Sequence, residues 1–338
     1  MRMFKRILYL GYYLKNLNCK QFWSFLKYAS KGNPLSMICL ILDCIWSVFK
    51  YNISILEYFQ FGFNQLNSIE KSKWAGTGCM YEFQLLMNPK STRDILDDKR
   101  KFYQAYRPFI KQKMFSVNDF ENKTTELNWK TAVTKDDLKF VFKQADGKCG
   151  KGVAILTSKE LRGVNILEFM NRNEYDLQEE FIVQHTDLMS LSPSAVNTIR
   201  IFTQLDAQDN VCLLGCRLRI SVNSHVDNMA AGNLAASIDE FSGVVNGLGY
   251  YSDITKAPEE FHPVSNVRIP GFQIPFWNDT LQLAKDAALF HKENRSIGWD
   301  VAISQDGPTL IEGNHDWCKL LWQLPVQQGL KIEIEKYV

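Results

Sequence analysis

Short apolar runs rich in β-branched and aromatic residues recur through the second half of the chain, and their apolar and polar positions alternate in the way that half-buried strands require. They are KFVFK at 139–143, VAIL at 153–156, FIVQH at 181–185, NTIRIFTQL at 197–205, VCLLGCRLRIS at 211–221, WDVAIS at 299–304 and TLIE at 309–312. A helical pattern lies between two of these runs, at 278–292, with Asn278 or Asp279 as its cap. Regular strand–helix–strand alternation is missing, so the pattern predicts an α+β fold of hairpins and helices.

The first 63 residues have a different texture, with helical patterns rich in Phe, Tyr, Trp and Lys and a break at Gly32-Asn33-Pro34. Residues 35–49 are the most apolar stretch, but they include Asp43 and fall short of the roughly 20 apolar residues that span a bilayer. We expect no membrane crossing here and, without a small-residue cleavage site, no export. Residues 91–111 predict a helix that ends near Pro108, followed by a polar stretch to Asp137.

The distribution of charge along the chain is uneven only near the N-terminus. The 338 residues suit two or three lobes, and 46% hydrophobic with 22% charged residues is ordinary for a globular protein. The net charge is +2, yet residues 1–42 hold seven Lys or Arg and no acid, which leaves −5 for the remainder. This asymmetry excludes a general nucleic-acid binder. Residues 1–63 form either a plain helical subdomain or a surface that rests on anionic lipid.

The eight cysteines show no CxxC pair, no zinc-site spacing and no disulfide framework, which fits reduced thiols in a cytosol. Cys212 and Cys216 stand four apart in an apolar strand pattern, where a place in the core is a simpler interpretation than a metal site.

A glycine-rich loop follows the first β-type run, in KFVFKQADGKCGKGV. Glycines let backbone N–H groups approach phosphate oxygens, and lysines supply positive charge. The candidate phosphate-binding residues are Lys143, Gly147, Lys148, Gly150, Lys151 and Gly152. A plain turn is the alternative. A Walker A loop is excluded because Val153-Ala154 stands where Lys-Ser/Thr is required, and no kinase HRD or DFG motif occurs.

The segment LQEEFIVQHTD predicts a strand end followed by polar residues. Backbone groups at such an end can pair with an adenine edge, and Asp187 is the candidate that holds ribose hydroxyls. An edge strand with a loop is the alternative interpretation. His185 is expected to make local hydrogen bonds, because no Ser or Cys nucleophile motif accompanies it.

Arginines gather on one face of the predicted hairpin 197–221. Period-two alternation places Arg217 and Arg219 on the same face of their strand, and Arg200 joins them from the neighbouring strand. Three guanidiniums without nearby acids favour a polyanionic ligand, whereas a solvated face is the alternative.

The segment IGWDVAISQDGPTLIEGNHDW predicts a hairpin that turns at Asp306-Gly307-Pro308. A three-residue loop pairs Gln305 with Thr309 and therefore places Asp300 opposite Asn314. Asp300, Glu312 and Asn314 then share one face, where hard oxygen ligands suit Mg²⁺. A one-residue slip in register would separate them.

Taken in order, these segments resemble the ATP-grasp superfamily, and specifically the sugar-transfer-associated ATP-grasp family, which is linked to capsule and polysaccharide synthesis. The resemblance runs from about Lys99 to Asn314. It is carried by DDK, KFVFKQADGKCGKGV, EEFIVQH, NTIRIFT, RLRISVNSHVDNMAAGN, HPVSNVRIPGFQIPFW, and GWD followed by GPTLIEGN. One departure is Gln144, where the family usually has proline after the lysine, and this puts the loop geometry in question.

The resemblance implies two α+β lobes that clasp ATP. Lys99 and Lys143 would reach its phosphates, and Glu180, Phe181 and Ile182 would line adenine. Arg200 and Arg219 would face the triphosphate or an acyl phosphate. Asp300, Glu312 and Asn314 would bind two Mg²⁺, with Glu312 bridging and Asn314 also catalytic. The remaining matched residues, together with Arg217, would contact substrate: Asp227, Asn228, Gly232, Asn233 and His262.

We therefore predict a helical N-terminal region at 1–68, an N-terminal part of the ATP-grasp unit at 69–137, a central lobe at 138–186 and a C-terminal lobe at 187–338. The expected function is a ligase that joins an amine to a carboxylate, with a uronic acid of a cell-surface glycan as the acid. An amino acid or peptide ligase, an alcohol kinase and a nucleotide-binding scaffold are the alternatives. The expected location is the cytoplasm, with peripheral contact to the membrane through residues 1–63.

Overall fold

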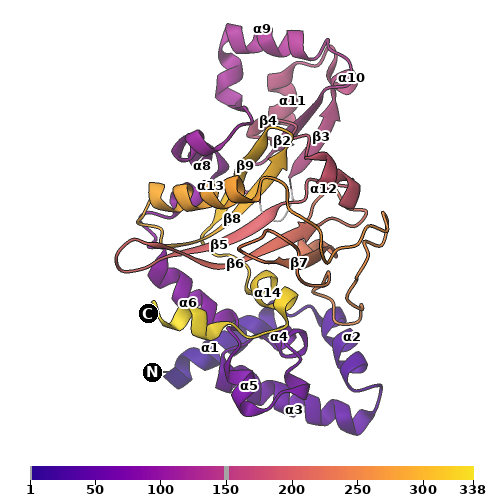
Figure 1. Cartoon of the computed structure of the whole chain (residues 1–338), viewed down its shortest axis with the longest axis vertical. Helices are drawn as coiled ribbons and strands as arrows, with labels where there is room; N and C mark the ends of the chain where they lie inside the picture. Colours follow the sequence, from indigo (N-terminus) through magenta and orange to yellow (C-terminus); the bar gives the residue numbers. More distant parts are fainter. Residues whose placement is uncertain (1, 148–151) are drawn as a thin grey trace.

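The computed structural model of the chain describes residues 2–147 and 152–338. Its framework consists of two antiparallel sheets, with orders β1-β4-β2-β3 and β7-β6-β5-β8-β9. They lie one above the other in Figure 1, with helices at both ends of the molecule. The predicted α+β class is confirmed.

The four-stranded sheet contains β1 (Met114–Ser116), β2 (Lys139–Lys143), β3 (Val153–Thr157) and β4 (Leu177–Glu180). Its helical cover comprises η3 (Val117–Glu121), α9 (Lys123–Ala132), α10 (Ser158–Leu161) and α11 (Ile166–Arg172). Phe120, Trp129 and Phe142 are buried in the core between them. The polar stretch before Asp137, for which the sequence analysis predicted no element, thus holds β1, η3 and α9 of this lobe. The strand predicted at 181–185 was wrong, because β4 ends at Glu180.

The five-stranded sheet contains β5 (Ile199–Leu205), β6 (Val211–Ile220), β7 (Leu234–Ile238), β8 (Ser296–Ser304) and β9 (Gly307–Asn314). Apolar residues on one face pack against α13 (Trp277–Phe290) and α8 (Lys99–Ala105). The predicted cap of α13 was wrong, since the helix begins at Trp277 after Phe276, which adopts a left-handed conformation and makes no side-chain cap.

The helix predicted at 91–111 is broken into α7 (Asp94–Asp97), α8 and η2 (Arg107–Phe109). Asp98 interrupts it in an extended conformation and accepts hydrogen bonds from the backbone N–H groups of Arg100 and Lys101. This new cap starts α8 at Lys99, which directs the first turn of α8 towards the glycine-rich loop: the backbone N–H of Lys99 donates to the carbonyl of Ala145.

The N-terminal region forms a helical module under the five-stranded sheet (Figure 1). It contains α1 (Arg2–Lys15), α2 (Cys19–Ala29), α3 (Pro34–Tyr51), α4 (Ile55–Gln60), η1 (Phe63–Gln65), α5 (Ser68–Ser72) and α6 (Thr77–Met87). The predicted break before Pro34 is confirmed: Asn33 caps α3 by accepting from the backbone N–H of Leu35 at 3.0 Å, and Pro34 occupies the first turn.

The helical module and the five-stranded sheet share one apolar core. The chain returns under the sheet through α14 (Lys319–Gln323), η5 (Leu324–Val326) and α15 (Lys331–Glu335). Just before α14, Trp317 contacts Phe202 of β5, Phe83 of α6 and Trp322 of α14. Lys319 also forms a 3.0 Å ion pair with buried Glu57 of α4. The module is therefore joined to the sheet by a continuous interior.

Candidate active site

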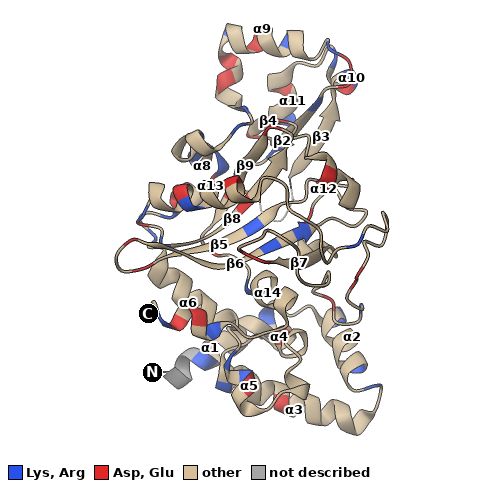
Figure 2. Ribbon diagram, viewed as in Figure 1, with Lys and Arg blue, Asp and Glu red and all other residues tan. Residues whose placement is uncertain are grey.

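A row of polar residues crosses the second face of the five-stranded sheet. Strand register places Ser237 opposite Arg217, Arg217 opposite Arg200, Arg200 opposite Asp300, and Asp300 opposite Glu312. Residues directly opposite one another on neighbouring strands point to the same face, so one member of each strand contributes to the row. The basic residues of β5 and β6 are visible in the middle of the molecule in Figure 2.

Two arginines hold Asp300. Arg200 donates from Nε to Oδ1 at 2.5 Å and from one terminal nitrogen to Oδ2 at 2.9 Å, while Arg219 donates to Oδ2 at 2.6 Å. Burial alone would raise the pKa of Asp300, but the two guanidinium charges outweigh it and hold that pKa well below the usual range. Asp300 is therefore ionised, and three hydrogen bonds hold its carboxylate in one orientation.

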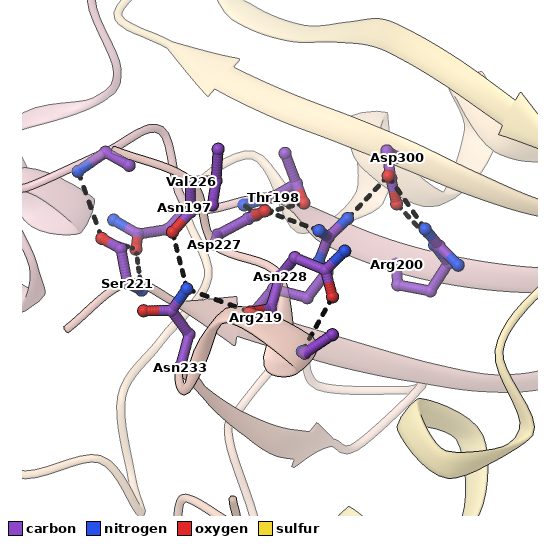
Figure 3. A network of polar contacts seen from close by, with 12 residues as sticks. Asn197, Thr198, Arg200, Arg219, Ser221, Val226, Asp227, Asn228, Asn233 and Asp300 are labelled. Atoms are coloured by element: carbon purple, nitrogen blue, oxygen red, sulfur yellow. Dashed lines mark hydrogen bonds and ion pairs between the residues drawn. The ribbon is translucent and has the colours of Figure 1, made fainter. Parts of the chain in front are cut away.

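The network continues from Arg219 to Asp227, at 2.7 Å (Figure 3). Asp227 accepts hydrogen bonds from the backbone N–H of Thr198 at 2.8 Å and from its hydroxyl at 2.5 Å. The expectation of three guanidiniums without nearby acids was thus wrong, because Arg200 and Arg219 each pair with a buried carboxylate. Strand order explains the error: β8 inserts beside β5 and brings Asp300 to both arginines.

Glu312 and Asn314 complete the acidic end of the row. Asn314 donates from its side-chain amide to Glu312 Oε1 at 3.2 Å and to the carbonyl of Gly298 at 3.3 Å. Burial raises the pKa of Glu312, and the charge of Asp300 beside it raises this pKa further. Because Asp300 is already charged, ionisation of the adjacent Glu312 is unfavourable unless a cation binds beside the two carboxylates.

These residues fit a Mg²⁺ site chemically. Asp300, Glu312 and the amide oxygen of Asn314 are hard oxygen donors on two paired strands, as the sequence pattern predicted. The predicted register was wrong, because Asp300 faces Glu312 and Gly298 faces Asn314. In the part of the chain that the structure describes, no group of three or more His, Cys, Asp or Glu could hold a metal. The candidate set therefore consists of two carboxylates and one amide.

Lys99, in the first turn of α8, interacts both with this acidic group and with the start of the glycine-rich loop. The Lys99 ammonium donates to the carbonyls of Gln144 and Ala145 at 3.4 Å and to that of Gly147. Burial lowers the pKa of Lys99 and the charge of Lys143 adds to this, while Glu312 and Glu179 act in the opposite direction. Lys99 therefore lies within electrostatic reach of both Lys143 and the candidate metal ligands.

Lys143 forms an ion pair with Glu179, whose side chain is buried. Glu179 was not predicted from the sequence. Glu179 lies on β4, which pairs directly with β2. The sequence could have indicated its position only through strand alternation, which places Glu179 on the opposite face of β4 from Gln178 and Glu180. Lys143, which was predicted to bind phosphate, thus has a carboxylate partner within its own lobe.

The glycine-rich loop begins where β2 and β3 separate, after the pair Lys143 and Val153. Gly152 adopts φ +69°, and a side chain at this position would collide with the side chain of Gln144. Gln144 also donates its backbone N–H to the carbonyl of Gly152 at 3.0 Å, so glutamine is accommodated where the family usually has proline. The predicted residues Lys148, Gly150 and Lys151 lie outside the described residues.

The segment 181–185 connects the two sheets. Gln184 forms a bridge with Ser304 of β8, and the backbone N–H of His185 donates to the carbonyl of Ile303 at 2.7 Å. Glu180, Phe181 and Ile182, the predicted adenine residues, follow the end of β4 on the way to this bridge. Glu180 accepts from the backbone N–H of Lys113 at 2.9 Å. Asp187 is exposed in the first turn of α12 (Thr186–Leu191), beside His185.

Several predicted substrate residues have internal partners instead. Asn233 is buried, accepts from the backbone N–H of Val222 at 2.8 Å and donates to the carbonyls of Val226 and Asn228. Asn228 caps η4 (Met229–Ala231), and Gly232 ends it with φ +88°. These three residues shape residues 221–233, which we call the 221–233 loop, and this loop carries Asp227 to Arg219.

Two further predicted substrate residues are buried and have internal partners. His262 is 1% exposed, with one ring nitrogen 2.9 Å from the carbonyl of Ser221 and the other 3.0 Å from the hydroxyl of Ser265. Arg217 donates to the carbonyl of Trp322 at 2.6 and 3.1 Å beneath α14. Burial lowers the pKa of Arg217 to about 10. It joins the sheet to the C-terminal segment.

The comparison with solved structures gave matches of low sequence identity. N5-carboxyaminoimidazole synthetase from Staphylococcus aureus complexed with ADP is 8% identical, with a TM-score of 0.42 and coverage of 74% of this chain and 57% of that one. D-alanyl-alanine synthetase A from Vibrio cholerae O1 biovar eltor is 11% identical, with a TM-score of 0.40 and coverage of 69% and 60%.

L-amino acid ligase from Bacillus licheniformis is 14% identical, with a TM-score of 0.37 and coverage of 71% of this chain and 48% of that one. The chain thus spans about half to three fifths of the length of these structures, and the similarity concerns the fold alone. A comparison with proteins of curated function found no significant match.

The family comparison is more specific. The model of the family described as sugar-transfer associated ATP-grasp matches residues 79–337, which include both sheets, the glycine-rich loop and the whole acidic and basic row. Most of the helical module lies before the matched region. On this match the chain belongs to the sugar-transfer-associated ATP-grasp family.

Proposed function

We propose that this chain is an ATP-dependent carboxylate–amine ligase that works through an acyl phosphate and attaches an amino acid or other amine to a uronic-acid-containing cell-surface polysaccharide or its precursor. The observation that carries the proposal is the row on the five-stranded sheet, where two arginines hold Asp300 and the opposite residue, Glu312, lies within electrostatic reach of Lys99. The glycan part rests on the family description.

The chemistry begins with ATP and a substrate carboxylate in the cleft. A carboxylate oxygen attacks the γ-phosphorus, the bond to the β-phosphate oxygen breaks, and ADP leaves. The amine then attacks the acyl carbon, inorganic phosphate departs with the electron pair, and the nitrogen loses a proton to give the amide. Both steps develop negative charge on phosphoryl oxygens, which fixed cationic groups stabilise.

The residues divide this work. Lys99 and Lys143 neutralise nucleotide phosphates beneath the glycine-rich loop, and the 181–185 segment offers backbone groups to adenine. Arg200 and Arg219 stabilise the transferred phosphoryl group while they orient Asp300. Asp300, Glu312 and Asn314 would hold Mg²⁺, which supplies charge neutralisation for phosphoryl transfer when bound.

The test combines purified protein, ATP and Mg²⁺ with a panel of uronic acids and amino acids. The expected result is ADP and phosphate in equal amounts, together with an amide that mass spectrometry detects. Hydroxylamine in place of the amine should give a hydroxamate. Glu312→Gln serves as the inactive control in the same preparation.

Two other outcomes would overturn the proposal. An alcohol kinase forms a phosphomonoester visible by ³¹P NMR, releases no phosphate and gives no hydroxamate. A peptide ligase joins amino acids to one another and leaves every uronic acid unchanged, which would remove the glycan part while the acyl phosphate chemistry remained.

A further inference from the structure

The outer side of α3 is apolar, although it faces away from the rest of the molecule. Leu35, Ile38, Leu42 and Trp46 are 75, 56, 63 and 63% exposed. Their spacing of three or four residues places them along one side of the helix. The opposite side carries the contacts to the module, with Cys44, Ser47 and Val48 buried. Thus α3 is apolar on both sides, and only one of them is covered.

Neighbouring helices extend this surface and surround it with positive charge. On α2, Trp23 and Tyr28 are 59 and 56% exposed, and Tyr12 of α1 is 60% exposed. Lys20 and Lys27 of α2 and Lys31 of the following loop are also exposed. Figures 1 and 2 show α2 and α3 at the end of the molecule remote from α9, with basic residues on α2 and at the turn that leads to α3.

We infer that this surface, made by α2 and the outer side of α3, docks on an anionic phospholipid bilayer with α3 parallel to the membrane plane. Apolar side chains would enter the boundary between headgroups and acyl chains, while the lysines contact lipid phosphates. The inference rests on the exposed surface and is independent of the reaction in the cleft.

A parallel orientation follows from the contacts of Asp43. This acid lies halfway along α3 and accepts from the Lys71 ammonium of α5 at 2.8 Å and from the Tyr58 hydroxyl of α4 at 2.7 Å. Among the described residues α3 is the helix whose length and composition would allow it to cross a membrane, and only 17% of that window is buried. Crossing would break both contacts to Asp43 and expose its charge to hydrocarbon. Docking leaves them intact.

Charge favours lipid over a second copy of the chain. Residues 1–42 carry seven Lys or Arg and no acid, so two such surfaces face to face would repel. Exposed tryptophan and tyrosine beside lysine suit the interfacial zone of a bilayer, because each side chain combines an apolar body with a polar end. An anionic leaflet satisfies both the apolar and the basic parts of the surface.

The test uses the full chain, because the helical module shares its core with the sheet. Binding is measured by co-sedimentation with phosphatidylglycerol and with phosphatidylcholine vesicles. The wild type should bind phosphatidylglycerol vesicles at low salt and be released by high salt. Leu42→Glu/Trp46→Glu and Lys20→Glu/Lys27→Glu should each lower the partition coefficient at least about tenfold, since each cation near the surface contributes to binding.

Matched controls carry the same changes elsewhere. Phe241→Glu alters an apolar residue that is 95% exposed and lies between β7 and α13, and Lys90→Glu/Lys135→Glu reverses two exposed lysines outside the surface. Both should bind vesicles like the wild type. Circular dichroism and ATP turnover in solution should be unchanged in all variants, because every altered side chain is exposed.

Three results would overturn the inference. The first is equal sedimentation of the wild type and both surface variants. The second is protein that alkaline carbonate does not extract from membranes, which would mean that α3 spans them. The third is a dimer in light scattering that Leu42→Glu/Trp46→Glu converts to monomer, with vesicle binding unchanged.

Discussion

Asp300 lies directly opposite Glu312, and this pairing depends on one extra residue in β9. The turn between β8 and β9 contains Gln305 and Asp306, and the register then shifts by one at Ile311. Without this bulge Asp300 would face Ile311, and Glu312 would point to the opposite side of the sheet. The acidic end of the row therefore exists because the strand is irregular at this point.

Glu312→Gln is expected to abolish turnover and to preserve the fold. The amide has nearly the same volume, but it removes one negative charge from the candidate metal ligands. ATP hydrolysis with the cognate substrates should fall at least about a hundredfold, and the circular dichroism spectrum should be unchanged. Glu293→Gln, at an exposed position, is the control. Wild-type turnover at saturating Mg²⁺ would show that Glu312 is not a ligand.

Lys143→Ala should raise the Kd for ATP more than tenfold, because a charge-assisted phosphate contact contributes roughly 1.5 to 3 kcal/mol. It should also lower the Tm, since Glu179 would be left buried without its partner. Calorimetry measures the affinity and a thermal melt the stability.

The double variant Lys143→Ala/Glu179→Gln separates the two effects. It should recover the Tm because no buried charge remains unpaired, while ATP binding stays weak. If the second change restored ATP affinity, the role of Lys143 would be only to neutralise Glu179.

Asp227→Asn should reduce turnover more than it reduces ATP affinity. The amide oxygen can still accept from Thr198, but Arg219 loses one of its two carboxylate partners and is less firmly held beside Asp300. We expect kcat to fall about tenfold or more and the Kd for ATP to change by less than about threefold. His225→Gln, at an exposed position of the same loop, is the control. An unchanged kcat would detach the 221–233 loop from catalysis.

The pair of Glu57 and Lys319 gives a pH dependence of stability. Burial alone would raise the pKa of Glu57, but the charge of Lys319 and hydrogen bonds from Thr77 and Ser54 bring that pKa below its ordinary value of 4.5. A lowered folded-state pKa stabilises the protein above about pH 4.5, and this contribution is lost as the pH falls through the folded-state value.

Glu57→Gln should therefore lower the free energy of unfolding at pH 7 by about 1 to 3 kcal/mol, since Lys319, whose side chain is 24% exposed, would lose its acid partner. The same variant should lose less stability than the wild type between pH 5 and pH 3, as urea titrations would show. Glu168→Gln, at an exposed position, should follow the wild-type curve. Parallel curves for wild type and Glu57→Gln would refute the assignment.

The sequence predicted where the strands of the site lie better than it predicted which side chains of the site contact one another. Alternation in KFVFK and in residues 211–221 depends on local preference and burial, and it located β2 and β6 closely. It also put Asp300, Glu312 and Asn314 on one face. That result survived an incorrect turn because two departures cancelled. The turn consists of residues 305–306 instead of 306–308, which reverses the side to which β9 residues point, and the bulge at Ile311 restores it.

Contacts between side chains on strands that are far apart in the sequence could not be predicted from these local patterns. Arg200 meets Asp300 because β8 pairs with β5, although 90 residues (206–295) separate the end of one strand from the start of the other. Local patterns contain no information on such a contact. The same limit explains His262, whose side chain contacts the carbonyl of Ser221, 41 positions earlier in the chain. Polar residue type alone does not separate a ligand contact from an internal one.

The apolar core beneath the glycine-rich loop is separate from the two cores that contact the five-stranded sheet. A lobe with a small interior of its own can open while the remainder stays folded, so amides of β2 and β3 should exchange with solvent faster than those of β5 and β8. A nucleotide that binds only the ordered lobe must supply the free energy of that ordering. Part of the apparent affinity for ATP is consequently set by packing around Trp129, and loosening that interior will weaken binding without any change to a residue that contacts the nucleotide.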